Sequence, residues 1–221
     1  MLLLVDKPKG ITSHDVIDRL RKITGIRKIG HAGTLDPNAT GLLIVGIGRE
    51  STKKLGDLTK RTQKVYIADI FLGETRDTDD IEGKITSKNK NNKEFSVKEV
   101  NDVVKKFVGD IEQTPPMYSA IKVKGKKLYE LARKGKKIEI EPRKVTIHSI
   151  KVLKYKYPDL KIKCKVSSGT YIRALTRDIG KELGCGAYLK GLRRTKIGEY
   201  SIKKAVELQK LTPENWRSVA V

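Results

Sequence analysis

The sequence predicts one globular domain that contains both strands and helices. Its 221 residues are enough to bury a single sizeable core. Apolar residues recur at a spacing of about two in some segments and of about 3.6 in others, and the two patterns alternate along the chain. We find no internal repeat and no low-complexity block. We therefore expect residues 1–221 to form a single domain.

Strands are expected at residues 2–5, 42–47 and 64–72. The first two segments are short apolar runs, and the fully apolar second one suits a central strand. The third alternates, which places Tyr66, Ala68, Ile70 and Leu72 on one face. A helix is expected from about Ser13, because apolar residues recur there at helical spacing: Val16, Ile17, Leu20 and Ile23.

The second half of the chain carries signals for two helices and one strand. Ser96 and Glu99 make a capping box for a helix whose apolar face is expected to hold Val97, Val100, Val104 and Phe107. An acidic loop over residues 77–83 precedes it. Residues 160–166 alternate, with one basic face made by Lys161, Lys163 and Lys165. A helix from about Thr170 to about Gly184 is expected to bury Ile172, Leu175 and Ile179.

The charge of the chain points to a polyanionic partner. Lys and Arg number 48 against 26 for Asp and Glu, which gives a formal net charge of +22 and an isoelectric point near 9.9. No apolar run approaches the roughly 20 residues that span a bilayer, and the opening MLLLVDKPKG is too short for a signal peptide. We therefore expect a cytoplasmic protein that binds nucleic acid and not membrane.

Residues 113–140 contain a basic segment that breaks the periodic pattern. Eight basic residues lie between Lys122 and Lys137, with Glu130 as the only acid. Such a run is either a solvated surface loop or an arm that contacts RNA. The total charge favours the arm, with Lys124, Lys126 and Lys127 as candidate RNA-binding residues.

The sequence gives no sign of a cofactor or a metal. Cys164 and Cys185 do not form a CxxC pair, and the three histidines are widely scattered. Neither a GxxxxGK[ST] phosphate loop nor a GxGxxG motif after a strand is present. We expect the reaction of this protein, if it is an enzyme, to need no cofactor.

The stretch GHAGTLDPNATGLLIVGIG, residues 30–48, places Asp36 among glycines ahead of an apolar run. An acid before Pro37 is either a turn residue or a reactive group, and residue type alone favours the turn. The surrounding segments change that balance. Five blocks resemble, in order, those of the tRNA pseudouridine synthase B (TruB) family: VDKPKGITSHDVI, GHAGTLDPNATGLLIVGIGRESTK, KVYIADIFLGETRDTDDIEG, PPMYSAIKVKGKKLYELARKG and SSGTYIRALTRDIGKELGCGAYLKGLRR.

The resemblance covers most of residues 3–200 and implies both a fold and an activity. The fold would be α+β, with a mixed, largely antiparallel sheet flanked by helices and a central catalytic cleft. The activity would be that of a tRNA pseudouridine(55) synthase, an isomerase that flips the target uridine out of the T-loop. The partner would be the tRNA T-stem-loop.

Catalytic roles carry over by position in these blocks. Asp36 matches the nucleophile, and Arg173 the arginine that pairs with its carboxylate through a planar guanidinium. Tyr66 matches the tyrosine that stacks on uracil and is the candidate for removing the C5 proton. For substrate binding, the resemblance implies a uridine pocket lined by Tyr171 and Leu192, a histidine that enters the RNA loop, His31, and supporting roles for Lys7 and Asp80.

One departure concerns the end of the chain. Family members commonly continue into a small C-terminal RNA-binding domain of the PUA type, whereas this sequence ends at WRSVAV. We therefore expect a stand-alone monomeric enzyme with no obligate protein partner. The alternatives are a non-catalytic RNA-binding or tRNA-folding protein and a structural ribosome-associated protein. The trio Asp36, Tyr66 and Arg173 argues against the first, and the amount of apolar core argues against the second.

Overall fold

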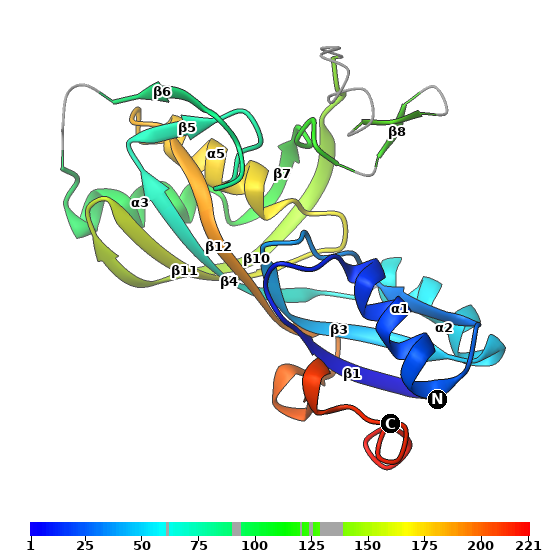
Figure 1. Cartoon of the computed structure of the whole chain (residues 1–221). Helices are drawn as coiled ribbons and strands as arrows, with labels where there is room; N and C mark the ends of the chain where they lie inside the picture. Colours follow the sequence, from blue (N-terminus) through cyan, green and yellow to red (C-terminus); the bar gives the residue numbers. More distant parts are fainter. Residues whose placement is uncertain (61, 90–93, 120, 124–125, 129–138) are drawn as a thin grey trace. The chain divides into compact units, whose positions relative to one another are not determined.

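The computed structural model describes residues 1–60, 62–89, 94–119, 121–123, 126–128 and 139–221 (Figure 1). The chain divides into two compact units. Unit 1 comprises Met1–Ile67, Lys165–Ser168 and Leu192–Val221, and unit 2 comprises Ala68–Cys164 and Gly169–Gly191. Three strands contribute residues to both units: β4 (Lys64–Leu72), β11 (Asp159–Val166) and β12 (Ala187–Ile197). The expected single folding domain stays a prediction.

Unit 1 is a mixed sheet with two helices. Its strand order is β14–β1–β3–β12, with β2 also on β3 and β13 on β12. Strand β3 is antiparallel to β1 and β2 but parallel to β12, and β14 is parallel to β1. The remaining elements of this unit are β1 (Leu2–Lys7), α1 (Ser13–Thr24), β2 (Ile29–Ala32), β3 (Ala39–Ile47), α2 (Arg49–Lys60), β13 (Tyr200–Ser201), η1 (Ile202–Lys204), β14 (Val206–Glu207) and η2 (Leu208–Lys210).

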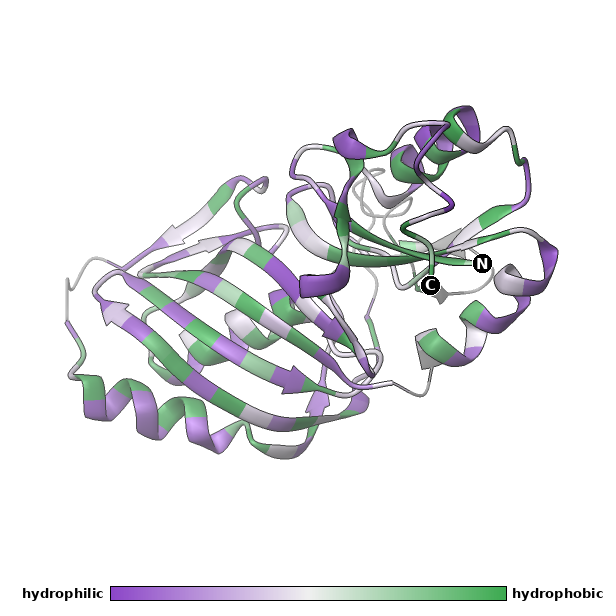
Figure 2. Ribbon diagram, turned by 90° about the horizontal axis from the view of Figure 1, so that it is seen from below, coloured by the Kyte–Doolittle hydropathy of each residue, from purple (hydrophilic) through white to green (hydrophobic). Residues whose placement is uncertain are grey.

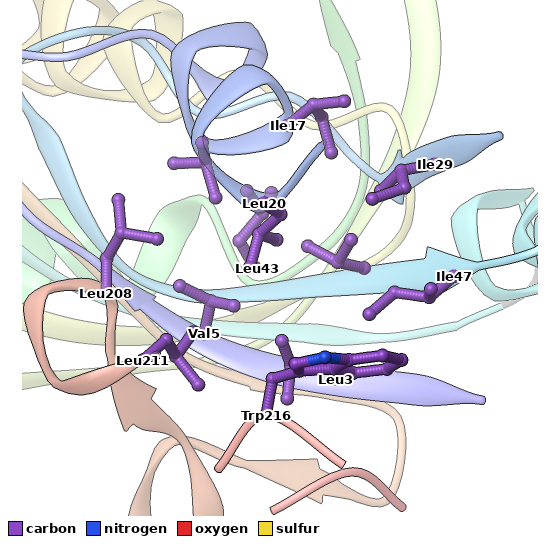
Figure 3. Packing of buried hydrophobic residues seen from close by; sticks show 12 residues of the cluster. Leu3, Val5, Ile17, Leu20, Ile29, Leu43, Ile47, Leu208, Leu211 and Trp216 are labelled. Carbon is purple, nitrogen blue, oxygen red and sulfur yellow. The ribbon is translucent and has the colours of Figure 1, made fainter. Parts of the chain in front are cut away.

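Strand β3 is apolar from Leu42 to Ile47, because both of its faces are covered there. Leu43, Val45 and Ile47 belong to one core cluster, which includes Leu20 of α1 and Trp216 near the chain's end (Figure 3). The alternate residues, Leu42 and Ile44, belong to a second cluster with Leu55 of α2. The expected central strand is thus confirmed, and it begins three residues earlier than its apolar run.

Helix α1 begins and ends as its sequence dictates. The side chain of Thr12 accepts a hydrogen bond from the backbone of Asp15, whose carboxylate accepts one from the Thr12 backbone, so both free donors are satisfied. Gly25 ends the helix in the left-handed conformation, at φ 71°. Val16, Ile17 and Leu20 are buried as expected.

Unit 2 is also a sheet with helices. Its strand order is β12–β4–β11–β10–β7, and α3 packs against β10 and α5. Two hairpins, β5–β6 and β8–β9, lie apart from this sheet. The elements are β5 (Glu74–Arg76), β6 (Ile85–Lys88), α3 (Val97–Lys106), β7 (Gly109–Gln113), β8 (Lys122–Val123), β9 (Lys126–Lys127), β10 (Arg143–Lys156), β11 (Asp159–Val166) and α5 (Ile172–Glu182).

Most of the expected elements of unit 2 are confirmed. Strand β11 alternates between exposed and buried residues along its whole length, and Figure 2 shows the alternating hydropathy along the strands of this unit. Helix α3 has the predicted capping box, but placing Val97 on its apolar face was wrong. Val97 is 59% exposed, because this first helical residue points to solvent while Val100 and Val104 enter the core.

The fold class is α+β, as predicted. The sheet pairings are mixed, and four α-helices lie in the described part of the chain. Within that same part, no helix is both long and apolar enough to cross a membrane.

Candidate active site

Asp36 lies in unit 1, on the loop of residues 33–38 that joins β2 to β3. Its side chain is partly buried. The carbonyl of Asp36 accepts a hydrogen bond from the backbone N–H of Ala39, at 3.0 Å, which closes the turn into β3. The loop is short, and three side chains from other segments form hydrogen bonds with its backbone.

Lys7 holds the loop beyond Asp36. This lysine is fully buried, and its ammonium group donates to the carbonyls of Pro37 at 3.1 Å, Ile11 at 2.6 Å and Pro8 at 2.9 Å. Burial lowers the pKa of Lys7 to about 8, while the nearby Asp36 carboxylate acts in the opposite direction. A buried ammonium is thus paired with three carbonyls next to the candidate nucleophile.

Ser13 and Arg194 hold the loop before Asp36. The hydroxyl of Ser13 donates to the carbonyl of Leu35 at 3.1 Å and accepts from its N–H at 2.9 Å. Arg194, only 1% exposed, donates to the carbonyls of Gly33 at 2.9 Å and Leu42 at 2.8 Å. Residues 33, 35 and 37 are therefore each fixed through the main chain.

Gly41 lets β12 approach the start of β3 closely. It has φ 103°, and a Cβ at this position would lie 2.3 Å from the carbonyl oxygen of Arg194. Any other residue would therefore collide with backbone and take an unfavourable conformation. The same close approach brings Leu192 opposite Ala39 in the β12–β3 register. Leu192 thus lies where the Asp36 loop enters β3.

The other predicted residues of unit 1 are His31 and Tyr66. Tyr66 lies on β4 and is 7% exposed. His31 lies on β2, and its buried Nδ1 has no hydrogen-bond partner among the described residues. Burial lowers the pKa of His31, and the charges of Arg194 and His14 act in the same direction. The neutral imidazole is therefore favoured.

Arg173, Asp80 and Tyr171 lie in unit 2, where Arg173 and Asp80 face each other. Arg173 lies in the first turn of α5 and is 6% exposed. Its guanidinium donates to the carbonyls of Tyr118 at 2.8 Å and Thr78 at 3.3 Å, and lies 3.7 Å from the Asp80 carboxylate. Tyr171 is the N-cap of α5, and its N–H donates to the side-chain oxygen of Gln113 at 2.8 Å.

The basic segment is described only in part. Lys126 and Lys127 form β9, which pairs with Val123 and Lys122 of β8 in an antiparallel hairpin. Lys124 and residues 129–138, which include the other basic residues of the predicted arm, lie outside the described residues. The role of Lys124, Lys126 and Lys127 in RNA binding stays a prediction.

Sequence reasoning missed the residues that hold the site. Ser13, Gln113 and Arg194 were not among the candidates. Arg194 had one available signal, which it shares with Arg193: it lies in the quoted block ending GLRR. Ser13 and Gln113 carry no such signal in the sequence, because their hydrogen-bond partners lie 22 and 58 residues away in the chain. The described residues contain no cluster of three or more His, Cys, Asp or Glu side chains that could hold a metal ion.

The chain belongs to the TruB family of pseudouridylate synthases. Residues 21–172 match the family described as TruB family pseudouridylate synthase (N terminal domain), and residues 173–219 match the tRNA pseudouridylate synthase B C-terminal domain. These two matches meet inside the first turn of α5, between Ile172 and Arg173. Members of this family are isomerases, so the chain is an enzyme, as predicted.

Curated relatives resemble this chain over nearly its whole length. The tRNA pseudouridine synthase B of Clostridium novyi (strain NT) is 49% identical over 97% of this chain and 73% of that protein. The protein of the same name from Endomicrobium trichonymphae is 46% identical over 94% of this chain and 89% of that protein.

Solved structures show the pseudouridine synthase fold. A chain in a Cbf5–Nop10–Gar1 complex has a TM-score of 0.72 and 29% identity, with 95% of this chain and 53% of that chain covered. A chain in an H/ACA RNP bound to a substrate RNA containing 2′-deoxyuridine also has a TM-score of 0.72, with 27% identity, and covers 98% and 54% of the two chains. This chain spans about half the length of these chains.

Proposed function

We propose that this protein converts uridine-55 in the T-loop of tRNA to pseudouridine, as a cytoplasmic monomer that needs no protein partner. The relatives from Clostridium novyi and Endomicrobium trichonymphae, both named tRNA pseudouridine synthase B, support tRNA as the substrate. The net charge of +22 suits a polyanionic substrate. The T-loop and the position within it are the specific part of this proposal.

The reaction is an isomerisation within one nucleotide. The bond from N1 of uracil to C1′ of ribose breaks, the uracil turns, and a bond from C5 to C1′ forms. C5 loses its proton and N1 gains one, so atoms and electrons balance without an oxidant or a hydrolytic water. A nucleophile is needed to hold the sugar or the base while the ring turns.

Asp36 is the proposed nucleophile. The observation that carries this assignment is the threefold hold on its loop at residues 33, 35 and 37 by Arg194, Ser13 and Lys7. A turn acid needs no such support, whereas a reacting carboxylate must be kept in a fixed position. The buried ammonium group of Lys7 also lies near enough to Asp36 for the two opposite charges to attract.

The other candidates support this step. Arg173 contributes a guanidinium, whose planar geometry suits the binding of a carboxylate. Tyr66 stacks on the uracil and is the candidate that removes the C5 proton, while Tyr171 and Leu192 line the uridine pocket. His31, in its neutral form, takes the space of the extruded nucleotide. Extrusion costs a few kcal/mol and is easiest from a loop, which favours the T-loop over a duplex.

The basic arm holds the RNA in this proposal. Lys126 and Lys127 lie on a two-stranded hairpin that follows the segment bonded to Arg173 at Tyr118. Lysines in such an arm bind phosphates without reading the sequence, so they position the stem while the loop enters the site.

Replacement of Asp36 by Asn tests the assignment. We expect pseudouridine formation in a T-stem-loop to fall by about a thousand-fold or more, with RNA affinity within about threefold of wild type. Asp57→Asn, an exposed acid on α2, is the matched control and should keep full activity. Turnover by Asp36→Asn within about tenfold of wild type would exclude the nucleophile. Mapping of the modified position tests uridine-55 separately.

A wild-type protein that binds the T-stem-loop and forms no pseudouridine in any tRNA would instead support the alternative of a non-catalytic RNA-binding or tRNA-folding protein.

A further inference from the structure

Arg173 has a structural counterpart one turn further along α5. Arg177 lies four residues later, on the same helix face. Arg173 faces Asp80 and donates to the carbonyl of Tyr118. Arg177 faces Asp79, at 3.0 Å, and donates to the carbonyl of Thr114 at 2.9 Å. The two arginines thus bind the same two segments, the acidic loop of residues 77–83 and the segment of residues 113–119.

Arg177 lies closer to its carboxylate partner than Arg173 lies to Asp80. Its Nη1 lies 3.0 Å from the Asp79 carboxylate, whereas the closest approach of Arg173 to Asp80 is 3.7 Å. Arg177 also donates from Nε to Asp178 at 3.0 Å, so its guanidinium is bound on three sides. The Arg173–Asp80 distance is too long for a direct hydrogen bond. Asp80 therefore does not fix the position of Arg173 by itself.

The backbone of Asp79 is arranged for this pair. Asp79 has φ 60°, and it is the only residue other than glycine with a positive φ in the described part of the chain. Neighbouring side chains of an extended chain point to opposite sides. The left-handed turn at Asp79 instead lets the carboxylates of both Asp79 and Asp80 reach α5. Such a conformation persists only where the surrounding structure enforces it, and it is frequent at functional sites.

The Asp79 peptide is held on both sides. Its N–H donates to the carbonyl of Arg76 at 3.1 Å, and its own carbonyl accepts from Leu189 of β12 at 3.0 Å. Its side chain is 14% exposed. Burial raises the pKa of Asp79, and the charges of Arg177 and Arg173 oppose that shift. The two arginines thus stabilise the ionised form of this carboxylate.

We propose that Arg177 and Asp79 form a positioning pair for Arg173. The pair ties the acidic loop and the 113–119 segment to α5, and so sets the distance between the Arg173 guanidinium and its carbonyl and carboxylate partners. The 113–119 segment leads into the β8–β9 hairpin, so the same pair also holds the chain just before that hairpin. This inference rests on the proposed function of Arg173.

The first experiment compares single-turnover rates and RNA affinity for Arg177→Gln and Asp79→Asn on a T-stem-loop. Asparagine tolerates the left-handed conformation, so Asp79→Asn removes the charge without backbone strain. We expect each variant to lose about tenfold in rate, with RNA affinity within about twofold of wild type. Lys181→Gln, an exposed lysine on the same helix, is the matched control and should keep the wild-type rate.

A double-mutant cycle then separates positioning from general destabilisation. Because both residues act through one pair, Arg177→Gln with Asp79→Asn should lose no more than the worse single variant, within about twofold. Arg177→Gln should also cost little in an Arg173→Lys background, where the geometry that it protects is already disrupted. Arg177→Lys, which keeps the charge, should recover part of the rate and serves as the test if Arg177→Gln fails to fold.

Wild-type rates in Arg177→Gln, rate losses that multiply in the double variant, or a loss confined to RNA affinity would each overturn the proposal. A wild-type protein that forms no pseudouridine would instead remove the proposed function, so the two failures are distinguishable.

Discussion

The Asp36 loop of unit 1 and the Arg173 site of unit 2 are held in different ways. The Asp36 loop is fixed by Lys7 and Arg194, which are 0% and 1% exposed and donate to the main-chain carbonyls of Pro37 and Gly33. Arg173 is bonded to carbonyls and faces carboxylates of a partly exposed loop. We therefore expect substitutions that disturb the support of the Asp36 loop to lower mainly the unfolding free energy. Substitutions at Arg173 should lower mainly the catalytic rate.

The strongest test of this difference is Gly41→Ala in unit 1. The new Cβ would lie 2.3 Å from the Arg194 carbonyl at a φ of 103°, so we expect a loss of about 3 to 5 kcal/mol in unfolding free energy. Gly48→Ala is the matched control, because Gly48 also has a positive φ of 88° but nothing lies within 4 Å of the added Cβ. It should lose only about 1 to 2 kcal/mol by denaturant unfolding. Equal losses of unfolding free energy in the two variants would mean that the close approach of β12 to Gly41 does not contribute to stability.

The corresponding change in unit 2 is Arg173→Lys. A lysine keeps the charge but cannot donate to Tyr118 and Thr78 with the planar geometry of the guanidinium. We expect kcat to fall by about a hundredfold and KM for the T-stem-loop to change by less than about threefold. The unfolding free energy should change less than in Gly41→Ala. A similar loss in kcat and in RNA affinity would show that Arg173 mainly holds RNA.

A pH series sharpens the account of the buried cations in unit 1. Burial, followed by the charge of Arg194, lowers the pKa of Lys64 to about 8 from an ordinary value of 10.5. Between these two values the unfolded chain binds the proton and the folded protein does not, so this group makes the fold more stable as pH rises. Below about 8 the lysine is charged in both states and its burial costs stability.

Lys64→Met removes this dependence. The stability of the variant relative to wild type should therefore fall as pH rises, by about 2 kcal/mol between pH ~7 and ~9.5. Denaturant unfolding at each pH measures it, and parallel profiles for the two proteins would contradict the lowered pKa.

The smallest expected effect concerns the basic arm of unit 2. Replacing Lys124, Lys126 and Lys127 by alanine should flatten the slope of log K against log salt by roughly two, at about 0.7 for each phosphate that a lysine no longer neutralises. The matched control removes the same charge from exposed positions of unit 1, through Lys22→Ala, Lys53→Ala and Lys54→Ala. An unchanged slope in the arm variant would mean that this segment is a solvated loop and that the RNA is held elsewhere, with the lysine face of β11 as the next candidate.

The sequence predicted the elements with strong local patterns. The alternation of residues 64–72 matches β4 (Lys64–Leu72), and the capping box at Ser96 matches the start of α3. Helix α2 escaped prediction because few of its residues are apolar and only one of these, Leu55, enters the core fully. The short strands β2 and β7 carry too few residues for a periodic pattern to show.

The sequence by itself determined the family, the Asp36 loop and the residue types offered for chemistry, since these are properties of contiguous segments. Only the tertiary structure decided which charged side chains are buried. Nothing local distinguishes Arg194 from its neighbour Arg193, yet the first is 1% exposed and holds the Gly33 carbonyl, while the second forms a partly exposed ion pair with Asp6. Likewise, Arg177 donates a hydrogen bond to Asp79, which lies 98 residues earlier in the chain. Burial and pairing of a charge depend on what packs against it from distant parts of the chain, and that is settled only when the sheet and helices assemble.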